Sequence, residues 1–149
     1  MKKLIISACL LGVPCRYDAK SKPILGISEL ESIATFLPIC PECDGGLPTP
    51  RVPAERVGDR VINREGGDVT EAYQRGARAA LELARRNGCR VALLKAKSPS
   101  CGKGQIYDGS FSGSLTDGNG VCAELLLQNG VRVFSEQEID ALIDYLKEI

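Results

Sequence analysis

The sequence contains no histidine, and this absence excludes more functional classes than any other feature of its 149 residues. Without histidine the chain cannot form a Ser-His-Asp triad, a Cys-His dyad or a zinc site with an imidazole ligand. Acid–base chemistry must therefore fall to the side chains of Asp, Glu, Cys, Lys or Tyr, or to water.

Tryptophan, net charge and long apolar runs are also missing. With no Trp, four Tyr and three Phe, the chain is poor in stacking residues, which argues against an extended platform for single-stranded nucleic acid. Lys plus Arg and Asp plus Glu both total 19, so no overall field attracts nucleic acid or an anionic membrane. No run approaches the roughly 18 apolar residues of a membrane span, so no membrane partner is expected.

The N-terminus MKKLIISAC is similar to a lipoprotein signal, with two lysines and then an apolar run ahead of Cys9. That run covers only residues 4–6 before small residues follow, whereas an export signal needs about 7–15 apolar residues. We therefore predict a first β-strand, a cytoplasmic protein and, from the length, a single domain over residues 1–149.

Seven cysteines are many for this length. In a reducing cytosol, clustered cysteines indicate metal binding or catalysis rather than a disulfide framework. Cys89 falls at a predicted turn and Cys122 near the start of an apolar helix, so both are predicted to be core residues. The remaining five are candidates for chemistry.

Predicted strands and helices alternate along the chain. The strands are expected at 3–8, 36–40, 90–96 and 131–134, and the helices at 26–36, 68–88, 121–130 and from 135 to the end. This alternation predicts an α/β fold, a small Rossmann-like or flavodoxin-like parallel sheet covered by helices on both faces. Pro38 makes the second strand a candidate edge strand.

Helix start signals are present at three places. Ser28 is a plausible N-cap for the first helix, and Asp68 with Glu71 has capping-box spacing for the second. Ser135 with Glu138 has the same spacing before the last helix.

Three cysteines follow predicted strands: Cys9, Cys40 and Cys101. In open parallel sheets, ligands bind beyond the carboxyl ends of the strands, so these three thiols are expected to converge on one rim. Cys101 lies in KAKSPSCGKG, a tight loop that suits chemistry better than a core. From the residues alone its role stays open among a redox disulfide, a zinc site, a covalent nucleophile and a cluster ligand.

Cys40 and Cys43 form a C-x-x-C motif. A thioredoxin-type thiol begins a helix, whereas Asp-Gly-Gly follows this motif, so a redox role is not favoured. A four-cysteine zinc site needs a second pair at metal spacing, and Cys9 and Cys15 are too far apart to supply it. Glu42, between the two thiols, is the best candidate for a half-buried carboxylate and a proton shuttle.

Two further segments have alternative interpretations. The arginines at 51, 56, 60 and 64 alternate with acidic residues, which favours a solvated, salt-bridged loop or hairpin. The alternative is an RNA-facing strip that includes Lys95, Lys97 and Lys103. The glycine-rich helix start DGNGVCA, residues 117–123, does not support a nucleotide cofactor but is compatible with binding some anion.

Three blocks of the sequence, SACLLGVPCRYD (7–18), CPECDGGLPTPRVPAE (40–55) and SPSCGKGQIYDGSFSG (98–113), carry a resemblance that spans essentially the whole chain. They resemble, in the same order, the signature blocks of the bacterial thiouracil desulfidase (TudS-like) family, formerly a family of unknown function. The resemblance implies a non-redox enzyme with a 4Fe–4S cluster held by only three cysteines, which leaves one iron without a protein ligand.

Four cysteines match the family motifs: Cys9, Cys15, Cys40 and Cys101. We expect Cys9, Cys40 and Cys101 to be the ligands, because these three follow strands, with Cys15 as a nearby helper or structural thiol. Cys43 departs from the family pattern, and as a fourth ligand it would close the open iron.

The resemblance implies that sulfur is removed from 2- or 4-thiouracil, or from 4-thiouridine in tRNA, to give the oxo base and sulfide. The partner would be a small thiobase or a thiolated tRNA. Glu42 would shuttle the proton, and Ser98 or Ser100 would hold the polar edge of the ring. The alternative is a non-catalytic module that binds zinc or an iron–sulfur group, or senses redox state, through Cys40, Cys43 and a third thiol.

Overall fold

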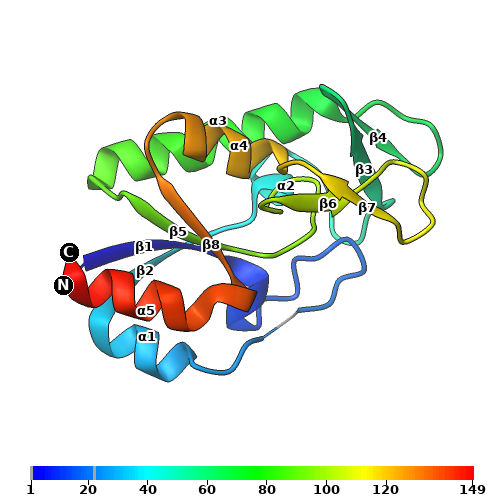
Figure 1. The fold of residues 1–149 in the computed structure, drawn as a ribbon. Helices are drawn as coiled ribbons and strands as arrows, with labels where there is room; N and C mark the ends of the chain where they lie inside the picture. The colour runs from blue at the N-terminus through cyan, green and yellow to red at the C-terminus, as the bar shows by residue number, and fades with distance from the viewer. Residues whose placement is uncertain (1, 22) are drawn as a thin grey trace.

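Four parallel strands form the central sheet of the computed structural model, which describes residues 2–21 and 23–149. They are β1 (Lys2–Ser7), β2 (Ala34–Ile39), β5 (Val91–Leu94) and β8 (Arg132–Ser135), in the order β2-β1-β5-β8 (Figure 1). All four residues of β5 are buried, as expected for a strand covered on both faces. The predicted parallel α/β sheet is confirmed.

Helices cover both faces of this sheet. The helices α3 (Thr70–Asn87) and α4 (Val121–Gln128) lie on one face, and α1 (Ile27–Ile33) and α5 (Ile139–Glu148) lie on the other (Figure 1). Alternate residues of β1 belong to two separate core clusters, Ile5 to one and Leu4 and Ile6 to the other, because successive side chains point to opposite faces. None of the described helices combines the length and apolar character that crossing a bilayer requires.

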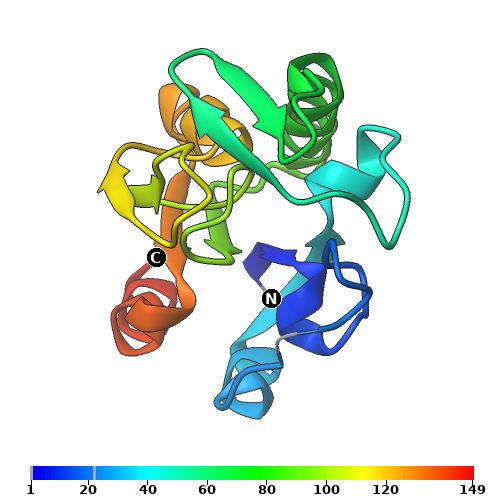
Figure 2. The same ribbon diagram turned by 90° about the vertical axis from the view of Figure 1, so that its right-hand side faces the viewer.

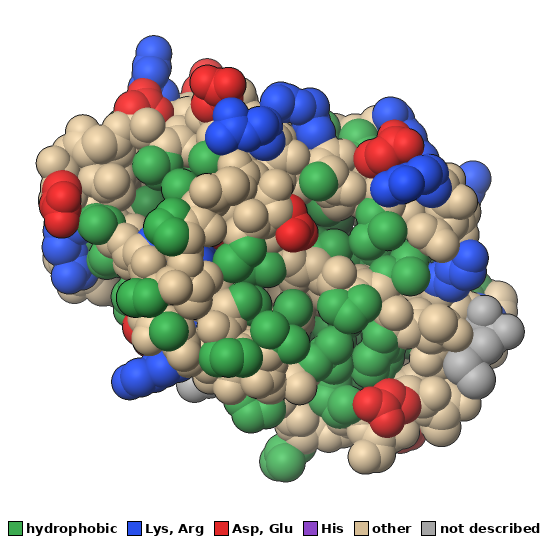
Figure 3. Space-filling view, turned by 180° about the vertical axis from the view of Figure 1, so that it is seen from behind, with side chains coloured by type: hydrophobic (Ala, Val, Ile, Leu, Met, Phe, Trp, Pro, Cys, Tyr) green, Lys and Arg blue, Asp and Glu red, His purple; other side chains and the backbone are tan. Residues whose placement is uncertain are grey.

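The strand β2 forms one edge of the sheet, as predicted from Pro38. Phe36 and Leu37 of β2 are half-buried and pack against opposite core clusters. Seen from behind, hydrophobic side chains gather over this edge, while most charged side chains lie towards the periphery (Figure 3).

Two β-hairpins lie outside the central sheet, both near the carboxyl ends of its strands (Figure 1). The first consists of β3 (Ala54–Val57) and β4 (Arg60–Asn63), and the second of β6 (Gln105–Tyr107) and β7 (Leu115–Asp117). Three short helical turns complete the fold: η1 (Ala8–Leu11), α2 (Pro41–Asp44) and η2 (Glu136–Glu138). Cys40 stands at the N-cap of α2, so the prediction that no helix follows this thiol was wrong.

Helix boundaries test the three predicted caps. Ser135 and Glu138 form the expected capping box before α5. The helix α1 instead begins after Gly26, whose φ of 89° supplies the left-handed entry, and Ser28 does not cap it. Asp68 accepts a hydrogen bond from the backbone of Thr70, but Val69 is the N-cap residue of α3.

Candidate functional site

The three cysteines that follow strands meet at one end of the sheet. Figure 2 looks onto the carboxyl ends of the strands, where η1, α2 and the loop after β5 surround a common centre. Cys9 lies in η1, Cys40 directly after β2, and Cys101 in the loop after β5. Together with Cys15 they line a cavity of about 330 Å³. The predicted convergence on one rim is confirmed.

Cys101 is the most enclosed of the four cavity thiols, with 4% of the residue exposed. The hydroxyls of Ser7 and Ser100 lie 3.4 and 3.5 Å from its Sγ, and its backbone N–H donates to Ser98 Oγ at 2.7 Å. Burial raises the pKa of Cys101 to about 11, although the two hydroxyl contacts act in the opposite direction. The thiol is therefore protonated at neutral pH until a positively charged group displaces the proton.

The start of α4 holds the Cys101 loop in place. The N–H groups of Gly120, Val121 and Cys122 donate to the carbonyl oxygens of Gly102, Pro99 and Ser100 at 2.7 to 2.8 Å. A Cβ at position 120 would lie 2.4 Å from the Ser100 carbonyl carbon, so only glycine permits this approach. The anion site considered for residues 117–123 is not formed, because these N–H groups are already occupied.

Close backbone packing also fixes α2, which carries Glu42 and follows Cys40. A Cβ at Gly76 of α3 would lie 1.8 Å from the carbonyl oxygen of Pro41, and one at Gly45 would lie 1.9 Å from that of Ala72. The one-turn helix α2 therefore lies directly on the backbone of α3.

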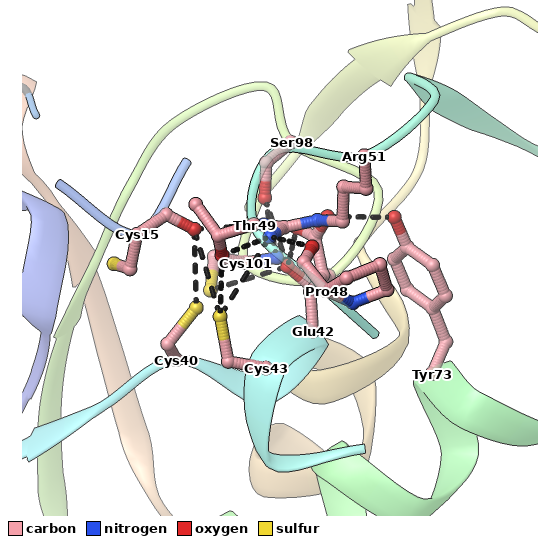
Figure 4. A network of polar contacts seen from close by, with 11 residues as sticks. Cys15, Cys40, Glu42, Cys43, Pro48, Thr49, Arg51, Tyr73, Ser98 and Cys101 are labelled. Carbon is pink, nitrogen blue, oxygen red and sulfur yellow. Dashed lines mark hydrogen bonds and ion pairs between the residues drawn. The ribbon is translucent and has the colours of Figure 1, made fainter. Parts of the chain in front are cut away.

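Glu42 receives three hydrogen bonds in this position (Figure 4). Its Oε1 accepts from Tyr73 Oη at 2.8 Å and from Arg51 Nε at 3.1 Å, while Oε2 accepts from Ser100 Oγ at 2.9 Å. Ser98 Oγ lies 3.3 Å from Ser100 Oγ. Glu42, Ser98 and Ser100 all line the cavity, so the structure brings together the expected proton shuttle and the two serines expected to hold the polar edge of the ring.

Arg51 corrects the prediction that its segment is solvated. Its side chain is only 6% exposed, and besides Glu42 its guanidinium contacts the Cys15 carbonyl oxygen at 3.0 Å and Cys43 Sγ at 3.6 Å. The signal that was missed is its presence in the same block as Glu42, since a half-buried carboxylate requires a nearby donor.

Tyr73 was not identified from the sequence. It lies on α3 with 1% of the residue exposed, where a helical aromatic suggests only core packing. Burial, together with the adjacent Glu42 carboxylate, raises the pKa of Tyr73 strongly, so the phenol keeps its proton and remains a hydrogen-bond donor.

Cys15, Cys40 and Cys43 form a chain of neighbouring thiols. Contact with Cys40 lowers the pKa of Cys15, but contact with Cys9 and burial raise it more, to about 11. Hydrogen bonding to Cys15 and burial raise the pKa of Cys40. Both Cys40 and Cys43 donate to the Cys15 carbonyl oxygen at 3.7 Å (Figure 4).

Cys43 differs from Cys9, Cys15, Cys40 and Cys101 because it does not line the cavity. Its Sγ lies 3.3 Å from Thr49 Oγ1 and 3.6 Å from Arg51 Nη1. Within the described residues, no three Cys, Asp or Glu side chains converge as they would around a single metal ion. This arrangement does not favour a zinc site built on the C-x-x-C motif.

Most other cations of the two basic segments are paired with carboxylates. The ion pairs are Arg56–Glu124, Arg60–Asp68, Lys95–Glu136 and Lys103–Glu138. Arg60 is 71% exposed and fits the predicted solvated hairpin, whereas Arg56 is 12% exposed. Cys89 and Cys122, at 6% and 0% exposed, are core residues as predicted.

Comparisons with known proteins agree with this geometry. The chain is 48% identical to the solved [4Fe-4S]-dependent thiouracil desulfidase TudS, with a TM-score of 0.93 and full coverage of both chains. It is 39% identical to the uncharacterized protein YbbK of Bacillus subtilis (strain 168), over 94% of this chain and 99% of YbbK. Residues 4–138 match the model of the family described as 2-thiouracil desulfurase. The chain therefore belongs to the 2-thiouracil desulfurase family.

Proposed function

We propose that this protein is a 4Fe–4S-dependent desulfidase that converts a thiolated pyrimidine and water into the oxo base and sulfide. One observation carries the proposal: thiols from three strand ends and the Glu42–Ser100 pair line the same cavity. The thiols alone would be compatible with a purely structural cluster of cysteines, and the Glu42–Ser100 pair alone would not indicate a metal site.

Cys9, Cys40 and Cys101 are the proposed cluster ligands. Thiolates are the ordinary ligands of iron–sulfur clusters, and these three come from separate strand ends around one cavity, so the donor set fits. When bound, a cluster iron that has no protein ligand supplies a soft Lewis acid suited to the sulfur of a thiocarbonyl. Cys15 lines the cavity beside them, and Cys43 does not reach it.

Glu42 is the proposed acid–base group. Arg51 and Tyr73 hold its Oε1, which leaves Oε2 directed to Ser100 at the cavity wall. A water molecule that adds to the ring carbon must lose protons, while the departing sulfur is released as sulfide. Oε2 can accept a proton from that water and pass it through the hydroxyl of Ser100, with Ser98 next to it, to the departing sulfur.

A free thiobase is the preferred substrate in this proposal. Among the cations that would form an RNA-facing strip, four already contact carboxylates: Arg56, Arg60, Lys95 and Lys103. RNA phosphates would have to compete for these cations, which weakens the case for tRNA. A small free base, unlike tRNA, agrees with the buried position of Cys101.

The test is the iron and acid-labile sulfide content of protein reconstituted without oxygen, followed by turnover of 2- and 4-thiouracil. About four irons and four sulfides per chain, with release of uracil and sulfide, are expected for a 4Fe–4S enzyme. Zinc at one per chain, or loaded protein without turnover, would contradict the proposal and favour the metal-binding module. Turnover of tRNA that contains 4-thiouridine, measured at low and high salt, tests the choice of substrate.

A further inference from the structure

Phe111 and Arg64 lie together at the cavity, on segments that contribute no cluster ligand. We infer that they form the wall against which the pyrimidine ring stacks. The inference rests on the proposed function, and it specifies the substrate as a planar heteroaromatic ring with a polar edge.

Aromatic side chains are concentrated at this cavity. The chain has four Tyr and three Phe, and three of these seven, Tyr17, Tyr107 and Phe111, line the cavity. Phe111 and Tyr107 are half-buried, so part of each side chain remains accessible. In a chain so poor in aromatics, their placement around one cavity favours a ligand with a π face.

The backbone of Phe111 is held in a conformation that a bulky residue rarely adopts. Its φ is 55°, in the left-handed region. Oε1 of Glu55, which is only 8% exposed, accepts hydrogen bonds from the backbone N–H groups of Gly109 at 2.9 Å and Phe111 at 3.1 Å. Such strain persists only where the surroundings enforce it, and it is found at ligand-binding positions.

Arg64 provides the polar part of the wall. Its guanidinium lies 5.5 Å from the centre of the Phe111 ring. Three other cations line the cavity, Arg16, Arg51 and Lys95, and each is paired with a carboxylate. Across residues 2–21 and 23–149, no carboxylate lies within ion-pair distance of Arg64, so its N–H groups are available to an exocyclic oxygen of the ring.

The test uses cluster-loaded protein and the variants Phe111→Ala, Phe111→Leu and Phe111→Tyr. Loss of the ring in the Ala and Leu variants should raise the KM for 2-thiouracil by about 5-fold to 100-fold, the usual effect of removing a stacking partner from a base. The Tyr variant should stay within about 2-fold of the wild type, since it retains the ring. Iron content should remain unchanged in all three, because Phe111 is not a ligand.

One control and two variants of Arg64 make the outcome specific. Leu115→Ala changes an exposed residue of β7 that does not line the cavity, and its KM should equal that of the wild type. Arg64→Gln should raise KM on its own, whereas Arg64→Lys should recover only part of the effect, because Lys lacks the planar guanidinium. Calorimetric binding of uracil to each variant gives a readout that does not depend on turnover.

An unchanged KM and an unchanged dissociation constant for uracil in both Phe111→Ala and Phe111→Leu would overturn the stacking wall. Failure of the proposed function looks different, because the loaded wild type would then not turn over thiouracil. Uracil binding would still report whether Phe111 contacts the ring in that case.

Discussion

Ser100 donates its hydroxyl hydrogen to Oε2 of Glu42 at 2.9 Å, which joins the loop after β5 to the helix after β2. The same hydroxyl lies 3.5 Å from Sγ of Cys101. One short contact thus connects the proposed acid–base group with a proposed ligand. This hydroxyl is therefore the group through which Glu42 would exchange a proton with the cavity in the proposed mechanism.

The substitution Glu42→Gln separates cluster binding from chemistry. We expect the variant to keep its iron and sulfide but to lose about 10²- to 10⁴-fold in kcat, the usual contribution of a positioned acid–base group. Iron analysis and steady-state turnover of 2-thiouracil measure the two effects. Glu71→Gln, at an exposed position of α3, is the control, and a kcat for Glu42→Gln equal to that of this control would remove Glu42 from the mechanism.

Removal of Arg51 should reduce stability as well as activity. The Arg51–Glu42 pair is largely buried, with side chains 6% and 15% exposed, so Arg51→Met leaves a carboxylate without its main counter-charge. We expect the free energy of unfolding to fall by about 3 kcal/mol, compared with about 0–1 kcal/mol for Arg60→Met, whose ion pair is on the surface. Urea denaturation compares the two, and equal losses would mean that burial of the Arg51 pair has no energetic importance.

The two thiols of the C-x-x-C motif should respond differently to substitution. Cys40 lines the cavity and Cys43 does not, so Cys40→Ser should lose the cluster whereas Cys43→Ser should retain about four irons per chain. The visible absorption of reconstituted protein, together with iron analysis, distinguishes the two variants. Loss of iron from Cys43→Ser would identify Cys43 as a ligand.

Gly120→Ala should displace the Cys101 loop although it changes no functional side chain. The added Cβ would lie 2.4 Å from the Ser100 carbonyl carbon, so α4 or the loop must move. We expect weaker iron retention together with at least a tenfold loss of kcat. Gly66→Ala, with φ of 85° and no atom within 4 Å of the added Cβ, has only a backbone cost of about 1–2 kcal/mol. An active Gly120→Ala variant with full iron content would show that this loop tolerates displacement.

Acid should weaken the start of α3 through Asp68. Hydrogen bonds from the Thr70 side chain and backbone, followed by Arg60, lower the pKa of Asp68 from 3.8 to about 2. Because the folded-state pKa lies below the unfolded value, the stabilisation is present above about pH 4 and is lost as the pH falls towards 2. Asp68→Asn should therefore melt below the wild type at pH 7, and the difference should vanish near pH 2. A Tm difference that does not change with pH would rule out this linkage.

The rim of cysteines could be predicted because it depends on topology alone. Cys9, Cys40 and Cys101 each follow a strand, and parallel strands end at the same edge of the sheet. The capping box of Ser135 and Glu138 was predictable for a different reason, since it lies within four consecutive residues.

Of the residues that hold Glu42, Tyr73 could not be predicted in this way. Tyr73 meets Glu42 only because α2 lies directly on α3, and that approach depends on the missing Cβ of Gly76. No periodicity or spacing records such a contact between segments. The anion site considered at the glycine-rich start of α4 is not formed for the same reason. The loop whose carbonyl oxygens occupy the N–H groups of α4 comes from elsewhere in the chain, and the local sequence does not record that contact.

Two different parts of the fold line the cavity, the end of the central sheet and the two hairpins, and this division bears on how substrate selectivity can change in such proteins. The proposed ligands and Glu42 lie on the rim of the central sheet, whereas Arg64 and Phe111 belong to the two hairpin segments outside that sheet. If the proposed site is correct, changes in the length or sequence of these hairpins would alter which ring is accepted and leave the proposed metal-binding rim intact. A single catalytic core could in this way serve a range of thiolated heterocycles, and the hairpins are the natural place to redesign its selectivity.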